Sequence, residues 1–317
     1  MRATYAPLKA GMVATALLFT VPPATRAQQT ISVNVNLVSV SFSARDARGA
    51  LVAHLTPDEL ELLEDNTPQK IAFFATSTDV PLSLGLIVDA SGSQDHFRKR
   101  HENDLALFLN RVLGPRDRAF LLCFGNHLRL VSDFTRSGGE VLQGLKTYEK
   151  HPGAFPEIGP REDRDLGTAF YDAIFYSVTE KLARQEGRRV LLVFSDGEDN
   201  SSSHDMMTTI EAAQAANVLV YTLRYTETKK NDALTARNRY GIRVMDRIAR
   251  ETGGVPIDAK ATEPQAYFQQ IAEELHTSYE LGYYPANRSK DGSFRKILIR
   301  PKRDGIVIRA KTGYFAR

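Results

Sequence analysis

An apolar run that ends in closely spaced oxygen-bearing side chains constrains the fold of this chain more than any other feature. Residues 81–93 read PLSLGLIVDASGS. The apolar part is continuous rather than alternating, which is typical of a central strand of a parallel sheet with both faces covered. Three oxygen-bearing residues follow in the turn that leaves this strand: Asp89, Ser91 and Ser93. A carboxylate and two hydroxyls are hard donors, which suit Mg²⁺ or a similar cation better than zinc.

Two further segments place oxygen-bearing side chains at the ends of predicted elements. The apolar strand expected at 190–194 ends in Ser195 and Asp196. Earlier in the chain, Thr168 precedes a segment in which apolar residues recur every four positions, as a helix packed on a sheet requires. Parallel strands share an edge at their carboxyl ends, and open α/β sheets bind ligands along that edge. We therefore expect Thr168 and Asp196 to lie near the turn at 89–93.

Each of these signals also has an ordinary structural explanation. Serine and aspartate are common in turns, and Ser93 can serve as a helix cap. Thr168 can likewise cap a helix, and Asp196 with the glycine that follows it can form a turn. Three signals in this order, each at the end of a strand or helix, favour a single site.

These residues resemble the von Willebrand factor A (VWA) domain. The similarity rests on D-x-S-x-S at 89–93, a threonine before a helix at Thr168, and an apolar strand that ends in S-D-G at Asp196; it spans roughly residues 81–276. More closely, the chain resembles the secreted VWFA-related acidobacterial family, in the flanking segments LTPDELELLEDNTPQKIAFF and YELGYYP. In VWA domains the five matching positions form the metal-ion-dependent adhesion site (MIDAS). The resemblance thus implies five metal ligands: Asp89, Ser91, Ser93, Thr168 and Asp196.

The proposed ligand set implies a binding function. Only Asp89 and Asp196 carry formal charge, so a bound divalent ion stays electrophilic and favours one more anionic oxygen. Its natural source is a glutamate or aspartate of a partner protein, which is also how the resembling domains bind ligands. The resemblance therefore implies an exported adhesion or assembly module without catalytic turnover. Mg²⁺, Mn²⁺ and Ca²⁺ are all candidate ions.

The alternative is a metal-dependent hydrolase or phosphoryl-transfer enzyme that uses the same site, with Asp89 as a nucleophile or the cation as a Lewis acid. Against this alternative, DASGS lacks the second aspartate of the haloacid dehalogenase-type D-x-D motif, and the sequence holds no H-E-x-x-H motif. Asp95, His96 and His204 are candidate acid–base groups near the site. We expect them to be surface residues that flank it.

The N-terminus predicts export. Arg2 and Lys9 precede or flank an apolar run at 10–21, and a stretch of small residues follows at 24–27. This pattern is typical of a cleavable secretory signal over residues 1–27, with an uncleaved anchor as the alternative. We expect a periplasmic or secreted protein that has no membrane span after cleavage.

Charge and length agree with these predictions. Lysine and arginine total 41 against 38 acidic residues, so the charge is nearly balanced and nothing indicates binding to nucleic acid. The 317 residues suffice for one α/β domain of about 200 residues and a smaller unit. The single cysteine, Cys123, lies in an apolar strand and predicts a core residue without a disulfide. No heptad repeat or duplication indicates an oligomeric state.

The remaining pattern predicts an α/β fold over residues 80–277, with a doubly wound, mostly parallel sheet. The resemblance implies that this is the Rossmann-like VWA fold. Strands and helices are expected at 82–88, 105–112, 119–124, 128–131, 170–182, 190–194, 210–216, 218–223, 244–251, 255–257 and 264–275. The irregular stretches at 149–167 and 226–240 should lie on the ligand edge of the sheet. Loops in such a position often determine the choice of partner.

β-rich flanks precede and follow the predicted α/β domain, at 28–79 and 278–317. The sequence T-P-D-E at 56–59 has a capping-box signature and predicts a short helix. Strand-like residues 60–63 and 71–74 predict a hairpin around Asp65 and Asn66. Because the termini of such domains often lie close together, we expect both flanks to form one accessory sheet with the α/β domain inserted between them.

Overall fold

A computed structural model describes residues 37–76, 80–159, 167–226, 234–261 and 263–317. The predicted signal segment 1–27 and the strand pattern around Val33 and Val35 lie outside the described residues. In the part of the chain that the structure describes, no helix has both the length and the apolar character needed to cross a membrane.

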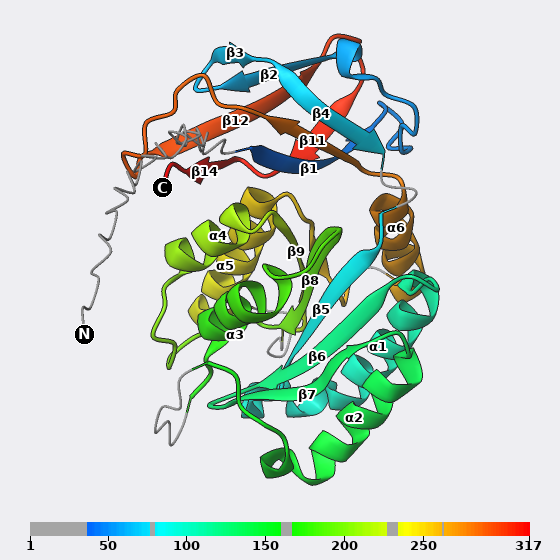
Figure 1. Ribbon diagram of the computed structural model, residues 1–317. Helices are drawn as coiled ribbons and strands as arrows, with labels where there is room; N and C mark the ends of the chain where they lie inside the picture. The colour runs from blue at the N-terminus through cyan, green and yellow to red at the C-terminus, as the bar shows by residue number, and fades with distance from the viewer. Residues whose placement is uncertain (1–36, 77–79, 160–166, 227–233, 262) are drawn as a thin grey trace, which may run out of the picture. The chain divides into compact units, whose positions relative to one another are not determined.

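A six-stranded sheet with the order β10-β9-β8-β5-β6-β7 forms the α/β domain (Figure 1). Its strands are β5 (Leu82–Asp89), β6 (Arg118–Phe124), β7 (Leu128–Thr135), β8 (Arg188–Ser195), β9 (Val218–Arg224) and β10 (Pro256–Asp258). All neighbours pair in parallel except β6 and β7, which are antiparallel. Every residue of β5 is buried, as its continuous apolar sequence predicts. The predicted doubly wound, mostly parallel fold is confirmed.

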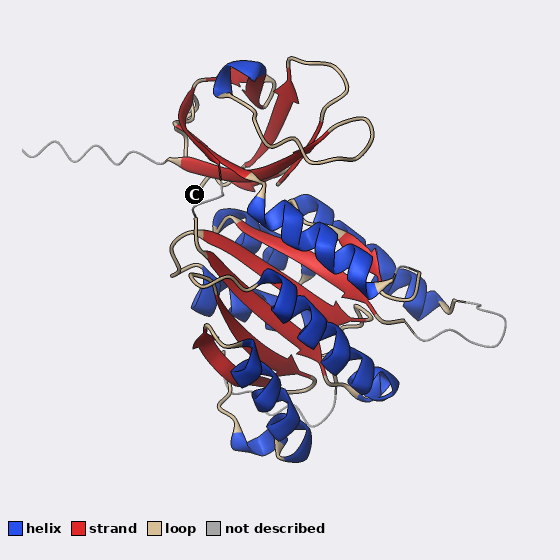
Figure 2. Ribbon diagram, turned by 90° about the vertical axis from the view of Figure 1, so that its right-hand side faces the viewer, coloured by secondary structure: helices blue, strands red, loops and turns tan. Residues whose placement is uncertain are grey.

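Helices cover both faces of this sheet (Figure 2). They are α1 (Arg98–Val112), α2 (Gly138–Lys150), α3 (Phe170–Tyr176), α4 (Met206–Ala215), α5 (Ala236–Thr252) and α6 (Pro264–His276). Apolar residues of α1, α2 and α6 pack on one face, and those of α3, α4 and α5 pack on the other. The apolar residues that recur every four positions after Thr168 are all fully buried, along α3 and the π-helical segment that continues it: Phe170, Ile174, Val178 and Leu182.

Two four-stranded antiparallel sheets form the accessory unit, with the orders β13-β1-β11-β4 and β14-β12-β2-β3. Their strands are β1 (Val38–Arg45), β2 (Leu60–Glu64), β3 (Thr67–Gln69), β4 (Ile71–Thr76), β11 (Tyr279–Tyr283), β12 (Phe294–Pro301), β13 (Val307–Ala310) and β14 (Gly313–Phe315). Strands that precede the α/β domain pair with strands that follow it, since β1 and β4 flank β11 and β2 pairs with β12. The flanks therefore do come together.

The accessory unit differs from the expectation of a single sheet. In β12, buried and exposed residues alternate. Each sheet therefore has one apolar face, and the two faces share one core that includes Phe42, Leu62, Tyr279 and Ile297. Two half-buried sheets that cover each other satisfy this alternation, whereas a single sheet would leave one apolar face unpacked.

Local details of the N-terminal flank also differ from the sequence prediction. The turn at Asp65 and Asn66 joins β2 to β3, whereas the strand expected at 71–74 is β4 and belongs to the other sheet. Both turn residues have positive φ, 48° and 64°, a conformation that Asp and Asn tolerate in tight hairpins. The short helix predicted at 56–59 is a 3-10 turn, in which the Glu59 carboxylate accepts the Thr56 N–H at 2.9 Å.

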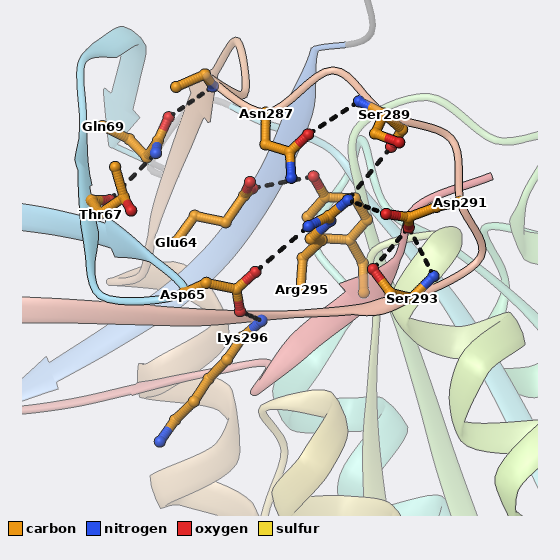
Figure 3. Close-up of polar contacts among 12 residues, drawn as sticks. Glu64, Asp65, Thr67, Gln69, Asn287, Ser289, Asp291, Ser293, Arg295 and Lys296 are labelled. Atoms are coloured by element: carbon orange, nitrogen blue, oxygen red, sulfur yellow. Dashed lines mark hydrogen bonds and ion pairs between the residues drawn. The ribbon is translucent and has the colours of Figure 1, made fainter.

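A buried arginine secures this hairpin to the C-terminal flank (Figure 3). Arg295 of β12 is 7% exposed and lies between two carboxylates, 2.8 Å from Asp291 and 3.7 Å from Asp65. Asp65 also accepts the backbone N–H of Lys296 at 2.9 Å. Nearby, buried Glu64 accepts the Tyr283 hydroxyl at 2.6 Å. These contacts fix the end of β2 against β12.

Charged side chains join the accessory strands to the α/β domain. Glu274, near the end of α6, accepts hydrogen bonds from Arg45 of β1 at 2.9 Å and from the Tyr221 hydroxyl at 2.6 Å. It also forms an ion pair with Arg309 of β13. Asn217 exchanges two hydrogen bonds with Ser41, at 3.0 and 3.3 Å. Because Glu274 is only 3% exposed, its arginine partners neutralise a buried charge.

Candidate metal centre

Asp89 ends β5 at the carboxyl edge of the sheet and is 1% exposed. Its Oδ1 accepts the Ser91 N–H at 2.9 Å, and its Oδ2 accepts the hydroxyl of Ser195, the last residue of β8, at 2.6 Å. Burial, and then the nearby charge of Asp196, raises the pKa of Asp89 to about 7. A cation bound beside these carboxylates would relieve their repulsion.

Asp196 follows β8 and contacts the turn after β5 directly. Its Oδ2 accepts the Ser93 hydroxyl at 2.8 Å and the Gln94 side-chain amide at 2.9 Å. Its Oδ1 accepts the Glu198 N–H at 3.0 Å. The Ser93 and Ser91 hydroxyl oxygens lie 3.2 Å apart. The carboxylate and both hydroxyls therefore form one connected chain of polar contacts.

Thr168 lies before the first turn of α3. Its backbone N–H donates to the Asn200 side chain at 2.6 Å, and its carbonyl accepts the Asn200 N–H at 3.1 Å. The N–H of Ala169 donates to the carbonyl of Gly125, just beyond β6, at 2.8 Å. Because these bonds use the backbone, the position of Thr168 does not depend on its hydroxyl.

A cavity of about 390 Å³ brings these segments together, and Ser91, Ser93 and Thr168 all line it. Asp89 and Asp196 do not line this cavity themselves, but the Ser91 N–H donates to Asp89 and the Ser93 hydroxyl donates to Asp196. Two carboxylates and three hydroxyls fit a hard, oxygen-preferring cation. Over the described ranges, the structure holds no group of three or more His, Cys, Asp or Glu residues that could bind a metal.

Two charged residues stand at the rim of this cavity. Glu198 and Arg237 both line it and lie 3.4 Å apart. Arg237 comes from the first turn of α5, and its side chain is 69% exposed. Burial, and then the charge of Asp196, raises the pKa of Glu198. A guanidinium pairs well with a carboxylate, so the rim offers an anionic ligand a second contact beside the candidate ligand oxygens.

Close packing of two glycines fixes the loop that carries Asp196. Gly197 has a φ of +78°, in the left-handed region that favours glycine. A Cβ at Gly241 of α5 would lie 2.2 Å from the carbonyl oxygen of Asp196. The helix therefore approaches the loop closely enough to determine where the Asp196 backbone lies.

The segment after Asp196 holds the start of α3. Asp199 accepts the Tyr171 N–H at 3.2 Å, and the Ser202 hydroxyl accepts the Asp172 N–H at 3.0 Å. Buried Asp172 lies 2.7 Å from Nδ1 of His204, whose ring stacks on an aromatic ring of α3. His204, expected to be a surface residue, is therefore part of this packing.

The two other acid–base candidates lie on the surface, as the sequence predicts. Asp95 forms an exposed ion pair with Arg98 at 2.6 Å, and His96 is exposed. Both residues belong to the 3-10 helix Gly92–Phe97, which begins within the turn at 89–93.

Sequence reasoning assigned no role to three residues that shape the centre: Gln94, Ser195 and Asn200. Gln94 is 1% exposed and holds Asp196, Ser195 is fully buried and holds Asp89, and Asn200 holds the backbone of Thr168. One signal for Ser195 is available in the sequence. A hydroxyl at the end of a continuous apolar strand is buried, and a buried polar group needs a partner.

The sequence matches no family model, and a search of curated proteins finds no match. The fold is similar to that of an aerotolerance-related membrane protein from Bacteroides fragilis, at 14% identity and a TM-score of 0.45, over 61% of this chain and 98% of that one. It is similar to proximal thread matrix protein 1 from the mussel byssus with a zinc-occupied MIDAS motif, at 12% identity and a TM-score of 0.46, over 67% and 49% of the chains. A third similar structure is the SpRpn10 VWA domain, at 14% identity and a TM-score of 0.39, over 60% and 95%.

Proposed function

We propose that this chain is a member of the VWA family and acts as an exported, metal-ion-dependent protein-binding module. The observation that carries the proposal is the convergence of three hydroxyl residues on one cavity, with two buried carboxylates bonded to that cluster. The proposed ligands are Asp89, Ser91, Ser93, Thr168 and Asp196, and the ion is Mg²⁺, Mn²⁺ or Ca²⁺.

The narrower parts of this proposal come from the sequence. They are membership of the VWFA-related acidobacterial family and a periplasmic or secreted location. The proposed organisation is a signal peptide at 1–27, an N-terminal β-rich flank at 28–79, a VWA domain at 80–277 and a C-terminal β extension at 278–317.

The proposed ligand is an aspartate or glutamate of a partner protein. A bound cation supplies an electrophilic centre for one more anionic oxygen. The chain itself positions that ligand: Ser93 and Asp196 are held together at 2.8 Å, and Arg237 at the rim offers the incoming carboxylate a cationic partner. Metal and partner are therefore expected to bind cooperatively.

The hydroxyl of Thr168 gives the sharpest test of metal binding. Thr168→Val keeps the shape of the side chain and both backbone bonds to Asn200 but removes one proposed ligand. We expect titration calorimetry to show Mg²⁺ or Mn²⁺ affinity reduced by about tenfold or more, or about 1.4 kcal/mol. The matched control is Thr208→Val on the exposed face of α4, which should bind metal like the wild type. Equal metal affinity in both variants would count against the site.

Capture of a partner tests the second half of the proposal. Wild-type protein, Thr168→Val and Arg237→Ala are used as baits against an envelope extract with Mg²⁺ and with EDTA. We expect a partner that the wild type retains only with Mg²⁺, that Thr168→Val loses and that Arg237→Ala retains weakly. A partner held equally well in EDTA would exclude metal-mediated capture.

The enzymatic alternative makes a different prediction. A nucleophilic Asp89 needs an accessible carboxylate, but this side chain is 1% exposed and both its oxygens accept hydrogen bonds. We expect phosphatase and esterase screens with Mg²⁺ to show no turnover. Sustained turnover that Asp89→Ala abolishes would favour the enzyme instead.

A further inference from the structure

A second cavity, of about 130 Å³, lies on the face of the sheet that α1 and α2 cover. The ends of β5 and β6, the first turn of α1 and the last turns of α2 all contribute to its wall. Asp89 lines it too, but no other proposed metal ligand does so among the residues that line this cavity. The cavity is therefore distinct from the hollow that Ser91, Ser93 and Thr168 line.

The inner wall contains a buried histidine with an unpaired nitrogen. His101 of α1 is 2% exposed, and its Nε2 has no hydrogen-bond partner among the described residues. The ring is held in place by Tyr225, whose ring lies edge-on at 4.3 Å between centroids. An unpaired buried polar atom costs about 1–3 kcal/mol, and an imidazole beside a cavity can recover that cost from a ligand.

Apart from the Asp89 carboxylate, the other inner groups are neutral or apolar. Cys123 is fully buried and is the only cysteine of the chain. Burial raises the pKa of its thiol, and burial lowers the pKa of His101 to about 3, so both groups are uncharged at neutral pH. Val88 and Leu145 supply apolar surface. The described residues of the inner wall include no cationic group, so an anion would lose its solvation here without compensation, and the apolar surface favours a neutral molecule.

The cavity reaches the surface through its charged rim. Arg98, Glu149 and Pro152 line it and are exposed, whereas His101 and Cys123 at the other end are buried. An apolar wall with a few convergent polar groups is the usual composition of a small-molecule site.

We propose that this cavity binds a small neutral molecule whose single hydroxyl or carbonyl group hydrogen-bonds to Nε2 of His101. Its size follows from the volume, because an apolar cavity of about 150 Å³ accepts benzene. The ligand therefore has about six to eight non-hydrogen atoms. The contacts proposed here do not involve a cation, although the cavity shares Asp89 with the proposed metal site.

Phenol and toluene are suitable probes, because they share a shape and only phenol has a hydroxyl. Binding is measured on the full chain by chemical-shift titration and by the rate at which methyl methanethiosulfonate modifies Cys123. We expect phenol at ten times its Kd to slow this modification about elevenfold by mass action. Cys123→Ser is the control and should take up no label.

The role of His101 is tested by the ratio of the two affinities. His101→Leu removes the ring nitrogens, and we expect the phenol-to-toluene affinity ratio to fall about fivefold, the value of one hydrogen bond. An unchanged affinity ratio would overturn the proposal. It would also be overturned if millimolar phenol neither changed the chemical shifts of the wild-type protein nor slowed the modification of its Cys123. Because the wild-type measurements need no variant, they decide the matter even if His101→Leu does not fold.

Discussion

Replacing Asp89 by asparagine should stabilise the metal-free protein while removing its response to metal. The carboxylate is buried beside Asp196, and its pKa is raised to about 7. Asparagine has the same shape and no charge. Its Oδ1 can still accept the Ser91 N–H, and its amide can donate to the Ser195 hydroxyl oxygen.

The magnitude follows from the pKa. The pKa of Asp89 rises from 3.8 to about 7, and at about 1.36 kcal/mol per pKa unit the ionised carboxylate costs the metal-free fold up to about 4 kcal/mol. The variant replaces the hydrogen bond from the Ser195 hydroxyl to a carboxylate by a weaker bond between neutral groups, which reduces this gain by about 1 kcal/mol. We expect Asp89→Asn to raise the free energy of unfolding by about 2–3 kcal/mol above pH 7 in EDTA.

The same pKa fixes the pH dependence and its sign. Between about pH 4 and pH 7 the folded wild type holds the Asp89 proton that the unfolded chain has released. The folded state therefore binds more protons, and the stability of the metal-free wild type falls as the pH rises through that window. The asparagine side chain of the variant cannot titrate, so the advantage of the variant should be absent near pH 4, grow up to pH 7 and then stay constant.

Urea denaturation at several pH values, in EDTA and in excess Mg²⁺, measures both effects. Mg²⁺ at 100 times its Kd should stabilise the wild type by about 2.7 kcal/mol and leave Asp89→Asn unchanged. Asp304→Asn, in an exposed turn, is the matched control and should alter neither quantity. The reasoning is refuted if Asp89→Asn destabilises the metal-free protein above pH 7 or still gains stability from Mg²⁺.

Three other predictions concern the supports of the site and of the fold. Gly241→Ala would push a Cβ against the carbonyl of Asp196, so calorimetry should show weaker Mg²⁺ binding, whereas Gly153→Ala, which has open space around it, should bind normally. Burial lowers the pKa of Lys311 to about 7, so between pH 7 and 10.5 the unfolded chain binds one more proton than the folded chain, and the wild-type unfolding free energy rises with pH in that window. Lys311→Met should raise the unfolding free energy at pH 7 by about 2 kcal/mol or more and should flatten this pH dependence. Glu274→Ala leaves two arginines without their buried partner, so urea denaturation should show an unfolding free energy lower by about 3–5 kcal/mol. Glu273→Ala, at the exposed neighbouring position, is the control and should change it little.

The order of elements in the α/β domain could be predicted from the sequence because each element carries its own local signal. The continuous apolar run of β5 indicates burial on both faces, and the four-residue spacing after Thr168 indicates a packed helix. The carboxyl-edge rule then places Asp89, Thr168 and Asp196 on one side of the sheet. Their placement at one edge of the sheet needs no long-range information beyond that rule.

Other features escaped because they depend on contacts between distant segments. Helix α2 buries only Val141 and Leu145, so its apolar spacing is too weak to predict it. The pairing of β4 with β11 rather than β2 is decided by packing across the two accessory sheets. The bond from Ser195 to Asp89 joins residues 106 positions apart, and no local pattern in the sequence selects it.

Two kinds of buried carboxylate in this chain support the proposed metal centre. Glu274 is 3% exposed, and the fold supplies it with Arg45 and Arg309. Asp89 and Asp196 are as deeply buried, yet the hydrogen bonds that the structure gives them come from hydroxyls, a side-chain amide and backbone N–H groups, all neutral. Neutral donors orient a carboxylate without supplying a compensating positive charge, so these two carboxylates remain available to a cation. A fold that gives one buried acid cationic partners and leaves two others side by side without any accepts a loss of stability there, which is the expected mark of a functional site.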